Sequence, residues 1–383
     1  MLKFINFTLW LIFSILSFGI LTYEMVVDET ISNANASIIK TVESDNDEII
    51  YCYDVHKQPA FSNPLFRNHP IQMRPSSYPQ GVQPKEHKKF ELTQIWHKYG
   101  LCPEGTVPIR RSGKNYHSDP ILSSKHLHPS SSNDVTNTNE FASITPVGDN
   151  FQGAQATINI WKPLIEQPQE FSASQIWISA DNKEVIETGW DVHKSLYGDE
   201  LPRIFVHWTA DHYNSTGCYN IQCPGFVQTT SKISLGSSFD KISIFHGTQS
   251  SADFVMFKDK STGNWWVQVQ GVDVGYWPHF LFKQLSTKAT RIDFGGQIAN
   301  TKPNMRHTKT QMGSGHFPSE GGFGISSYFR RVKVFDGNYE AKVPGTVFMI
   351  QSNTNCYGLK LGQTDWSGII FYYGGPGFSS TCQ

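Results

Sequence analysis

From residue 151 to the C-terminus, short stretches of alternating apolar and polar residues follow one another, separated by turn-forming residues. This period-two pattern predicts β-strands with one buried face. We expect strands at residues 156–161, 175–179, 204–208, 241–245, 254–258, 265–270, 328–335 and 368–373. Few convincing amphipathic helices lie between them, so successive strands should pair antiparallel in a sandwich or barrel. The sequence therefore predicts a mainly β fold, an antiparallel sandwich or barrel, over residues 149–383.

The N-terminal 23 residues have the form of a secretory signal. Lys3 precedes a nearly unbroken apolar run over residues 4–21, and Ser17 and Gly19 have the small-residue spacing of a cleavage site. The run is also close to the roughly 20 residues that a membrane helix needs. We expect a signal peptide over residues 1–23 that is removed, with an uncleaved anchor as the alternative.

Six cysteines in an exported chain indicate a disulfide framework. Six cysteines allow 15 pairings, and proximity along the chain suggests Cys52–Cys102, Cys218–Cys223 and Cys356–Cys382. The alternative is a metal site at Cys218 and Cys223. No second Cys/His pair with zinc spacing follows them, so we expect no metal.

Two Asn-x-Ser/Thr sequons, at Asn35 and Asn214, predict exposed N-glycosylation sites. The formal net charge of −1 gives no electrostatic reason to expect nucleic acid or an acidic membrane surface as a partner. After the signal, no apolar stretch is long enough to span a bilayer. We therefore expect no membrane association once the signal is cleaved.

The part of the chain before the sandwich divides into two segments. Residues 24–111 are polar and rich in proline, and they are too few to bury much of a core without a bridge such as Cys52–Cys102. Residues 112–148 are rich in Ser and Asn and poor in apolar side chains, which is typical of a solvated linker. In an exported protein such a linker is a natural site of proteolytic processing.

Familiar catalytic motifs are missing from the sequence. There is no His-Glu-x-x-His, no Gly-x-Ser-x-Gly and no P-loop, and nothing predicts a cofactor. The carboxylates are the remaining candidates. Glu187 stands just before an apparent turn, close to a tryptophan, and Asp293 stands near Gln297. Taken alone, each is best explained as an ordinary polar residue at a strand edge.

Several long segments, in a fixed order, together carry a family resemblance. They are residues 58–61, 69–73, 102–111, 171–177, 217–228, 263–266, 275–278 and 307–318. From about residue 40 to its end, the chain resembles the plant neprosin family. Residues 24–111 resemble its activation peptide, for which we expect a small α+β fold, and residues 149–383 resemble its catalytic domain.

The resemblance implies a secreted zymogen in an extracellular (apoplastic) or vacuolar setting. Peptidases of this family are glutamic endopeptidases that cut after proline in acid, without a metal or a cofactor. Their active site lies in a concave groove of a β-sandwich. The implied partners are a proline-containing peptide or protein substrate and the chain's own propeptide.

The resemblance places the first catalytic glutamate at Glu187. The second belongs in a Gly-Gly-Glu segment, which here reads Gly-Gly-Gln and ends at Gln297. Glutamine is nearly isosteric with protonated glutamic acid and its amide group can donate a hydrogen bond. The eqolisins, an unrelated group of glutamic peptidases, similarly pair one Glu with one Gln. A Glu187/Gln297 dyad therefore predicts an active peptidase, with an inactive binder of proline-rich peptide or cell-wall material as the alternative.

Two further predictions concern the surroundings of this dyad. Asp293 could supply the missing second carboxylate only if it shares a strand face with Gln297. That requires that no bulge intervenes, and the two glycines at 295 and 296 favour a bulge. Aromatic side chains should line a groove for proline-containing peptides, and the candidates are Trp190, Trp265, Trp266, Tyr276 and Trp277. The alternative place for these rings is the sandwich core, and the adjacent Trp265 and Trp266 should point in opposite directions.

Overall fold

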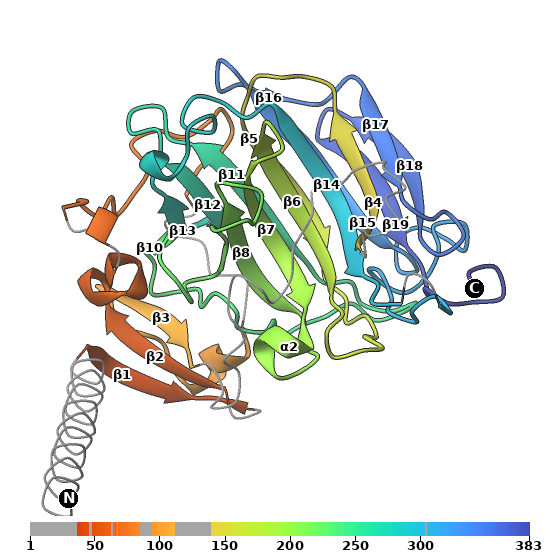
Figure 1. Cartoon of the computed structure of the whole chain (residues 1–383), viewed down its shortest axis with the longest axis horizontal. Helices are drawn as coiled ribbons and strands as arrows, with labels where there is room; N and C mark the ends of the chain where they lie inside the picture. Colours follow the sequence, from red (N-terminus) through yellow and green to blue (C-terminus); the bar gives the residue numbers. More distant parts are fainter. Residues whose placement is uncertain are drawn as a thin grey trace, which may run out of the picture.

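The computed structural model describes residues 37–45, 48–62, 64–66, 68–84, 94–111, 139–302 and 305–383. Two large antiparallel sheets pack face to face, and a smaller sheet lies beside one end of them (Figure 1). The predicted mainly β fold with an antiparallel sandwich is confirmed. The predicted signal peptide, the sequon asparagine Asn35 and the linker up to residue 138 lie outside the described residues. Among the helices that the structure describes, none has the length and apolar character to cross a membrane.

One sheet of the sandwich has seven strands, in the spatial order β17-β4-β14-β6-β7-β8-β9. Their bounds are β17 Val347–Gln351, β4 Asn139–Pro146, β14 Arg291–Ala299, β6 Ser172–Ala180, β7 Glu184–Val192, β8 Arg203–Thr209 and β9 Cys218–Tyr219. A single turn of α-helix, α2 (Lys194–Tyr197), follows β7. The central strands β14, β6 and β7 pair without a register shift, so their side chains alternate regularly between the two faces of the sheet.

The second sheet has nine strands, in the order β10-β13-β12-β11-β5-β15-β19-β18, with β16 paired to β15. Their bounds are β10 Val227–Gln228, β13 Val272–Trp277, β12 Trp265–Val269, β11 Ser251–Lys258, β5 Phe151–Asn159, β15 Ser327–Asp336, β19 Gly368–Gly374, β18 Gly358–Asp365 and β16 Ala341–Lys342. A 3-10 turn, η6 (His279–Leu281), follows β13. The apolar main core fills the space between the two sheets, and its fully buried members all lie between residues 142 and 382.

The segment before the sandwich forms a three-stranded sheet from β1 (Ile38–Glu43), β2 (Ile49–Asp54) and β3 (Thr106–Arg110). Its helices are all 3-10 turns among the described residues, namely η2 Val55–Lys57, η3 Pro59–Ser62, η4 Pro64–Phe66 and η5 Ile95–Tyr99. Pro59 and Pro64 each begin one of these turns, because proline suits a first helical position but lacks the N–H that a longer helix needs.

Between β2 and η5 the chain crosses the outer face of the nine-stranded sheet, near β12 and β13 (Figure 1). We call residues 58–82, described except for 63 and 67, the strap. Gln58, the first residue of the strap, is held by two hydrogen bonds to Gln228. The Gln58 amide nitrogen donates to the Gln228 carbonyl at 2.9 Å, and the Gln58 amide oxygen accepts from the Gln228 N–H at 2.8 Å. The strap therefore belongs in sequence to the segment before the sandwich, but it packs against the sandwich in space.

Two predictions about the chain's organisation need correction. Strand β4 begins at Asn139, inside the predicted linker, because Phe141, Ala142 and Ile144 are buried in the seven-stranded sheet. The predicted strand at residues 241–245 is not formed. Its apolar side chains stay largely exposed, with Ile244 at 60%, so the alternating pattern there has no sheet to complete.

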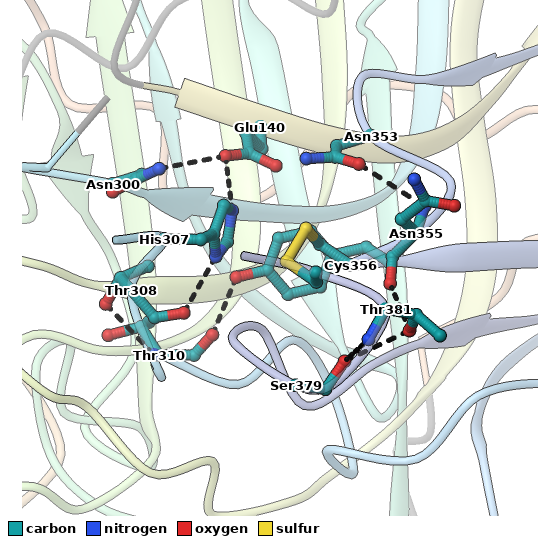
Figure 2. Close-up of a disulfide and its surroundings, with 12 residues drawn as sticks. Glu140, Asn300, His307, Thr308, Thr310, Asn353, Asn355, Cys356, Ser379 and Thr381 are labelled. Atoms are coloured by element: carbon teal, nitrogen blue, oxygen red, sulfur yellow. Dashed lines mark hydrogen bonds and ion pairs between the residues drawn. A yellow bond between two sulfur atoms is a disulfide. The ribbon is translucent and has the colours of Figure 1, made fainter. Parts of the chain in front are cut away.

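The three predicted disulfides are confirmed, as Cys52–Cys102, Cys218–Cys223 and Cys356–Cys382. The first ties β2 to the segment that precedes β3. The last joins the chain end to the loop before β18 (Figure 2). Asn214, the second sequon asparagine, lies exposed in the loop between β8 and β9.

Candidate active site

The face of the seven-stranded sheet that is turned away from the main core carries the predicted catalytic residues. Side chains that pair across neighbouring antiparallel strands point to the same face. Trp177 of β6 is paired with Glu187 on β7 and with Asp293 on β14. Glu187 therefore lies in the middle of its strand, and the turn expected just after it is absent. We call this surface the site face.

A second row of cross-strand pairs lies four residues further along the same three strands. Ala173 of β6 is paired with Asp191 on β7 and with Gln297 on β14. Glu187 and Gln297 thus share the site face, as the dyad hypothesis requires, on strands that flank β6 from opposite sides. Both side chains are fully buried.

Gln175 lies midway between these two rows, on the diagonal that joins Glu187 to Gln297. Its own cross-strand neighbours are both glycines, Gly189 on β7 and Gly295 on β14. A Cβ added at Gly189 would come within 2.1 Å of the Ser174 carbonyl oxygen, and one at Gly295 within 2.3 Å of the Ala142 carbonyl oxygen. Only glycine permits these close backbone approaches on either side of Gln175.

A chain of amide hydrogen bonds orients Gln297. The Gln175 amide nitrogen donates to the Gln297 amide oxygen at 2.9 Å, and the Gln297 amide nitrogen donates to Asn139 Oδ1 at 2.9 Å. One hydrogen of the Gln297 NH2 group is therefore engaged, and the second remains to donate elsewhere. The buried Gln175 amide oxygen has no hydrogen-bond partner among the described residues, so the site face contains one unsatisfied acceptor.

Aromatic side chains from β8, β9 and the loop between them lie next to Glu187. The Tyr213 hydroxyl donates to Glu187 Oε1, and His207 Nδ1 lies 3.4 Å from the same oxygen. The His207 ring is stacked between Tyr213 and Tyr219, with centroid distances of 5.1 and 4.1 Å. Burial and the neighbouring Glu187 charge raise the pKa of Tyr213 well above its usual range, so this phenol stays protonated and remains a donor.

Asp191 brings a second buried carboxyl group to the site face. Burial raises the pKa of Asp191 well above its usual range and the Glu187 charge adds to the rise, while a hydrogen bond from Tyr197 and the charge of Arg203 act in the opposite direction. Asp191 is therefore held in its protonated form to a higher pH than an exposed aspartate.

Asp293 differs from Asp191 in its environment. It shares the site face because β14 keeps a regular register, so the bulge predicted at the two glycines is wrong. Its carboxylate accepts from Arg291 Nε and Nη2, each at 2.9 Å, and from the Thr145 hydroxyl. Trp177 stands between Asp293 and Glu187. This carboxylate is already bound by an arginine and is poorly placed to replace a glutamate at position 297.

The five aromatic residues predicted for the substrate groove lie elsewhere. Trp190, Trp265 and Trp277 are part of the main core between the sheets. Trp266 and Tyr276 belong to a separate cluster on the outer face of the nine-stranded sheet, beneath the strap. The predicted opposite orientation of Trp265 and Trp266 is confirmed. Neither ring reaches the site face, because both belong to the other sheet.

One cluster among the described residues has the composition of a metal site, but its chemistry is wrong for one. A ring nitrogen of His307 and the sulfurs of Cys356 and Cys382 lie within 4.8 Å of one another. The two sulfurs are joined in a disulfide, and the His307 ring nitrogens bond to Glu140 Oε1 at 2.7 Å and to the Thr308 carbonyl at 2.8 Å (Figure 2). The sulfur atoms and the ring nitrogens are therefore already bonded to protein groups and do not form a metal site.

Three members of the site face were missed in the sequence, namely Gln175, Asp191 and Tyr213. Gln175 and Asp191 acquire their positions only from strand register, which local patterns do not give. The one usable signal was the pair of glycines at 189 and 295, which mark close backbone approach inside strand-like segments. Tyr213 lies on the loop that carries the Asn214 sequon, and no pattern links that loop to Glu187.

Comparison with protein families gives two matches. The Neprosin family model matches residues 168–376, and the model of the Neprosin activation peptide matches residues 41–153. The first match spans the site face from β6 to β14 and includes Glu187 and Gln297. The second spans the three-stranded sheet, the strap and the linker, and extends into the first strands of the sandwich.

Among solved structures, a complex of scytalido-glutamic peptidase with a transition state analog inhibitor matches at 14% identity, with a TM-score of 0.35. SCP-B, of the Eqolisin family of peptidases, bound to the tripeptide Ala-Ile-His, matches at 12% identity and a TM-score of 0.33. Each alignment covers 62% of this chain and 98% of that chain. CG-16, a homodimeric agglutinin from chicken liver, matches at 9% identity and 0.23, over 41% of this chain and 92% of that chain. At these TM-scores the likenesses carry no argument.

Proposed function

The chain belongs to the neprosin family, and from that premise we propose that it is a secreted peptidase zymogen, a glutamic endopeptidase that cleaves after proline in acid. The membership rests on the match over residues 168–376. The zymogen form is supported by the activation-peptide match over residues 41–153. An extracellular or vacuolar destination, and a glycan on the exposed Asn214, belong to the same proposal.

The observation that carries the proposal is the placement of Glu187 and the Gln175–Gln297 amide pair on one buried face. Ionised Glu187 takes a proton from a water molecule, whose oxygen then attacks the carbonyl carbon of the scissile peptide bond. The free hydrogen of the Gln297 amide group donates to the oxyanion that forms. Protonated Glu187 returns its proton to the leaving nitrogen, so the bond breaks with all protons accounted for.

The strand register gives an approximate distance between Glu187 and Gln297. In a flat antiparallel sheet, two strand spacings of about 4.8 Å and four residues of about 3.4 Å place the Glu187 and Gln297 Cα atoms roughly 17 Å apart. The Glu187 carboxylate is bonded to Tyr213, and the Gln297 amide group to Gln175 and Asn139, so the attacking water and the substrate peptide must bridge the gap that remains between them. Gln175 lies below the middle of that gap, where its unpaired amide oxygen can accept a substrate backbone N–H.

The test is a peptidase assay on purified, acidified protein with a proline-rich peptide. The wild-type chain should cleave after proline, Glu187→Gln should abolish cleavage, and Gln297→Ala should lower kcat by about 10²–10³, as expected for loss of one oxyanion donor. Asp293→Asn is the matched control, since that carboxylate is held by Arg291, and it should leave kcat within a few-fold of wild type. An inert wild-type chain that gains activity on Gln297→Glu would show instead that the dyad has decayed.

The second candidate is a non-catalytic binder of proline-rich peptide or cell-wall material. The specific observation in its favour is Gln297 itself, which removes one of the family's two carboxylates. Binding of the peptide without turnover, in both the wild-type chain and Gln297→Glu, would select this function.

A further inference from the structure

The outer face of the nine-stranded sheet carries an apolar surface on the opposite side of the sandwich from Glu187. Its buried sandwich residues are Val227, Val255, Phe257, Trp266, Tyr276 and Phe335, and they form a cluster separate from the main core. The rest of that cluster comes from the strap, chiefly Ala60, Phe66 and Val82. Two large aromatic rings, Trp266 and Tyr276, are therefore kept from water by a segment that family membership marks as removable.

Polar groups of the sandwich form hydrogen bonds with the strap along this face. Asp259 accepts from the Gln72 side-chain amide and from the Ser76 backbone N–H, each at 2.6 Å, and from the Ser76 hydroxyl. Asp273 accepts from the Tyr78 hydroxyl at 2.6 Å. The face thus offers carboxylates to the hydroxyl and amide donors of an extended chain.

Tyr276 adds a contact to the strap backbone. Its hydroxyl accepts from the Gln72 N–H at 3.1 Å and bonds to His69 Nε2 at 2.8 Å. Two of the strap groups bound on this face, the N–H groups of Gln72 and Ser76, belong to the main chain. Contacts to the main chain do not depend on one particular sequence.

The occupant is proline-rich and extended. From residue 70 to 79 it contains no helix or strand, and it carries Pro70, Pro75 and Pro79. Pro75 and Pro79 are buried, whereas Pro70 is exposed. Proline fixes an extended backbone at little entropic cost and presents a flat apolar ring, which is the form that aromatic surfaces bind.

We propose that this face, formed around Trp266, Tyr276 and Asp259, is a second binding site for extended proline-rich polypeptides with hydroxyl or amide side chains. The strap is its occupant in the zymogen. When the strap leaves, an incoming chain of the same chemistry takes its place. The site lies on a different sheet from Glu187, so this binding is independent of the proposed peptidase activity.

The experiment uses the full chain with Glu187→Gln, so that no bound peptide can be cut. Pro75→Ala and Pro79→Ala are added to loosen the strap. A fluorescent synthetic peptide of residues 68–82 is the probe, and its anisotropy reports binding. The loosened chain should bind the probe at least tenfold more tightly than the chain with an unmodified strap, whose own Pro75 and Pro79 compete for the face.

Matched variants test the chemistry. In the probe, Pro75→Ala with Pro79→Ala should weaken binding at least tenfold, whereas Pro70→Ala should leave it unchanged. In the loosened chain, Asp259→Asn and Tyr276→Phe should each weaken it about tenfold, because each removes hydrogen bonds that the strap now makes. Asp240→Asn is the control, since Asp240 contacts Lys98 of η5 rather than the strap.

A second arm asks whether the site accepts other chains. An unrelated peptide of Ser-Pro repeats with Tyr and Gln should compete with the probe. The same competition should appear when the chain is cut between residues 112 and 138 and the segment before the cut is washed away, since the buried residues of the main core all lie within residues 142–382. The inference is overturned if loosening the strap does not improve binding, if the proline-free probe binds equally well, or if the unrelated peptide fails to compete.

Discussion

Replacing Phe66 by alanine should release the strap from the nine-stranded sheet without unfolding the sandwich. Phe66 is only 1% exposed, and it is the largest strap side chain in the apolar cluster on that face. Its ring packs edge-on against Phe61, His69 and Phe280, with centroid distances of 6.3, 6.0 and 5.3 Å. Phe66 is not a member of the main core.

The expected magnitude follows from this burial. Truncating a fully buried phenylalanine to alanine costs about 3–5 kcal/mol. Because each 1.4 kcal/mol is a factor of about ten, even the lower figure raises the population of the open strap roughly a hundredfold. Leu65→Ala is the matched control in the same 3-10 turn. Leu65 is 69% exposed, so its truncation should change stability by no more than about 0.5 kcal/mol.

Hydrogen exchange measures the difference directly. The Gln72 and Ser76 amides donate to groups of the sheet, so their exchange should accelerate about a hundredfold in Phe66→Ala and stay unchanged in Leu65→Ala. Amides of β7 should keep their wild-type protection in both variants. Equal exchange in the two variants, or acceleration that reaches β7, would refute the idea that the strap opens as a unit.

Three further changes should have distinct effects. Because the pKa of Asp191 is raised in the folded chain, folding favours its protonated form, and its contribution to stability is lost as pH rises from the unfolded value toward the folded one. Asp191→Asn should therefore raise the Tm at neutral pH but not in strong acid. Each unit of pKa elevation corresponds to about 1.4 kcal/mol, and each kcal/mol regained raises the Tm by about 2–4 °C. An equal Tm shift at both pH values would contradict this. Gly295→Ala should cost about 1–3 kcal/mol and most of the peptidase activity, measured by thermal melts and turnover, since its Cβ would press on the Ala142 carbonyl. Removing the Cys52–Cys102 bridge, which spans 50 residues, should cost the small sheet about 4 kcal/mol in denaturant titrations while the sandwich transition stays in place.

Much of the fold follows from local pattern. The alternation at residues 175–179, 204–208 and 254–258 predicted strands that the structure contains, because the core forces one face of each inward. The same pattern failed at residues 241–245, where nothing buries the apolar side chains. Alternation says which side chains share a face, but it does not say whether a partner strand exists.

The site shows the same division between local and long-range information. Glu187 and Gln297 were found through resemblance, and their shared face follows from the regular register of β14, β6 and β7. Gln175 and Asp191 could not be found, since their positions depend on which residues of distant strands lie opposite. The opposite orientation of the Trp265 and Trp266 side chains was predictable, but the sheet to which they belong was not.

The chain passes from the small sheet to the sandwich between β3 and β4. These two strands belong to different sheets, and each completes its own sheet without help from the other. A break between residues 111 and 139 therefore takes no strand out of register. The segment before the sandwich and the sandwich itself should consequently be able to fold as two separately synthesised polypeptides and combine in solution, so that the detached segment would bind the sandwich as a reversible, diffusible ligand.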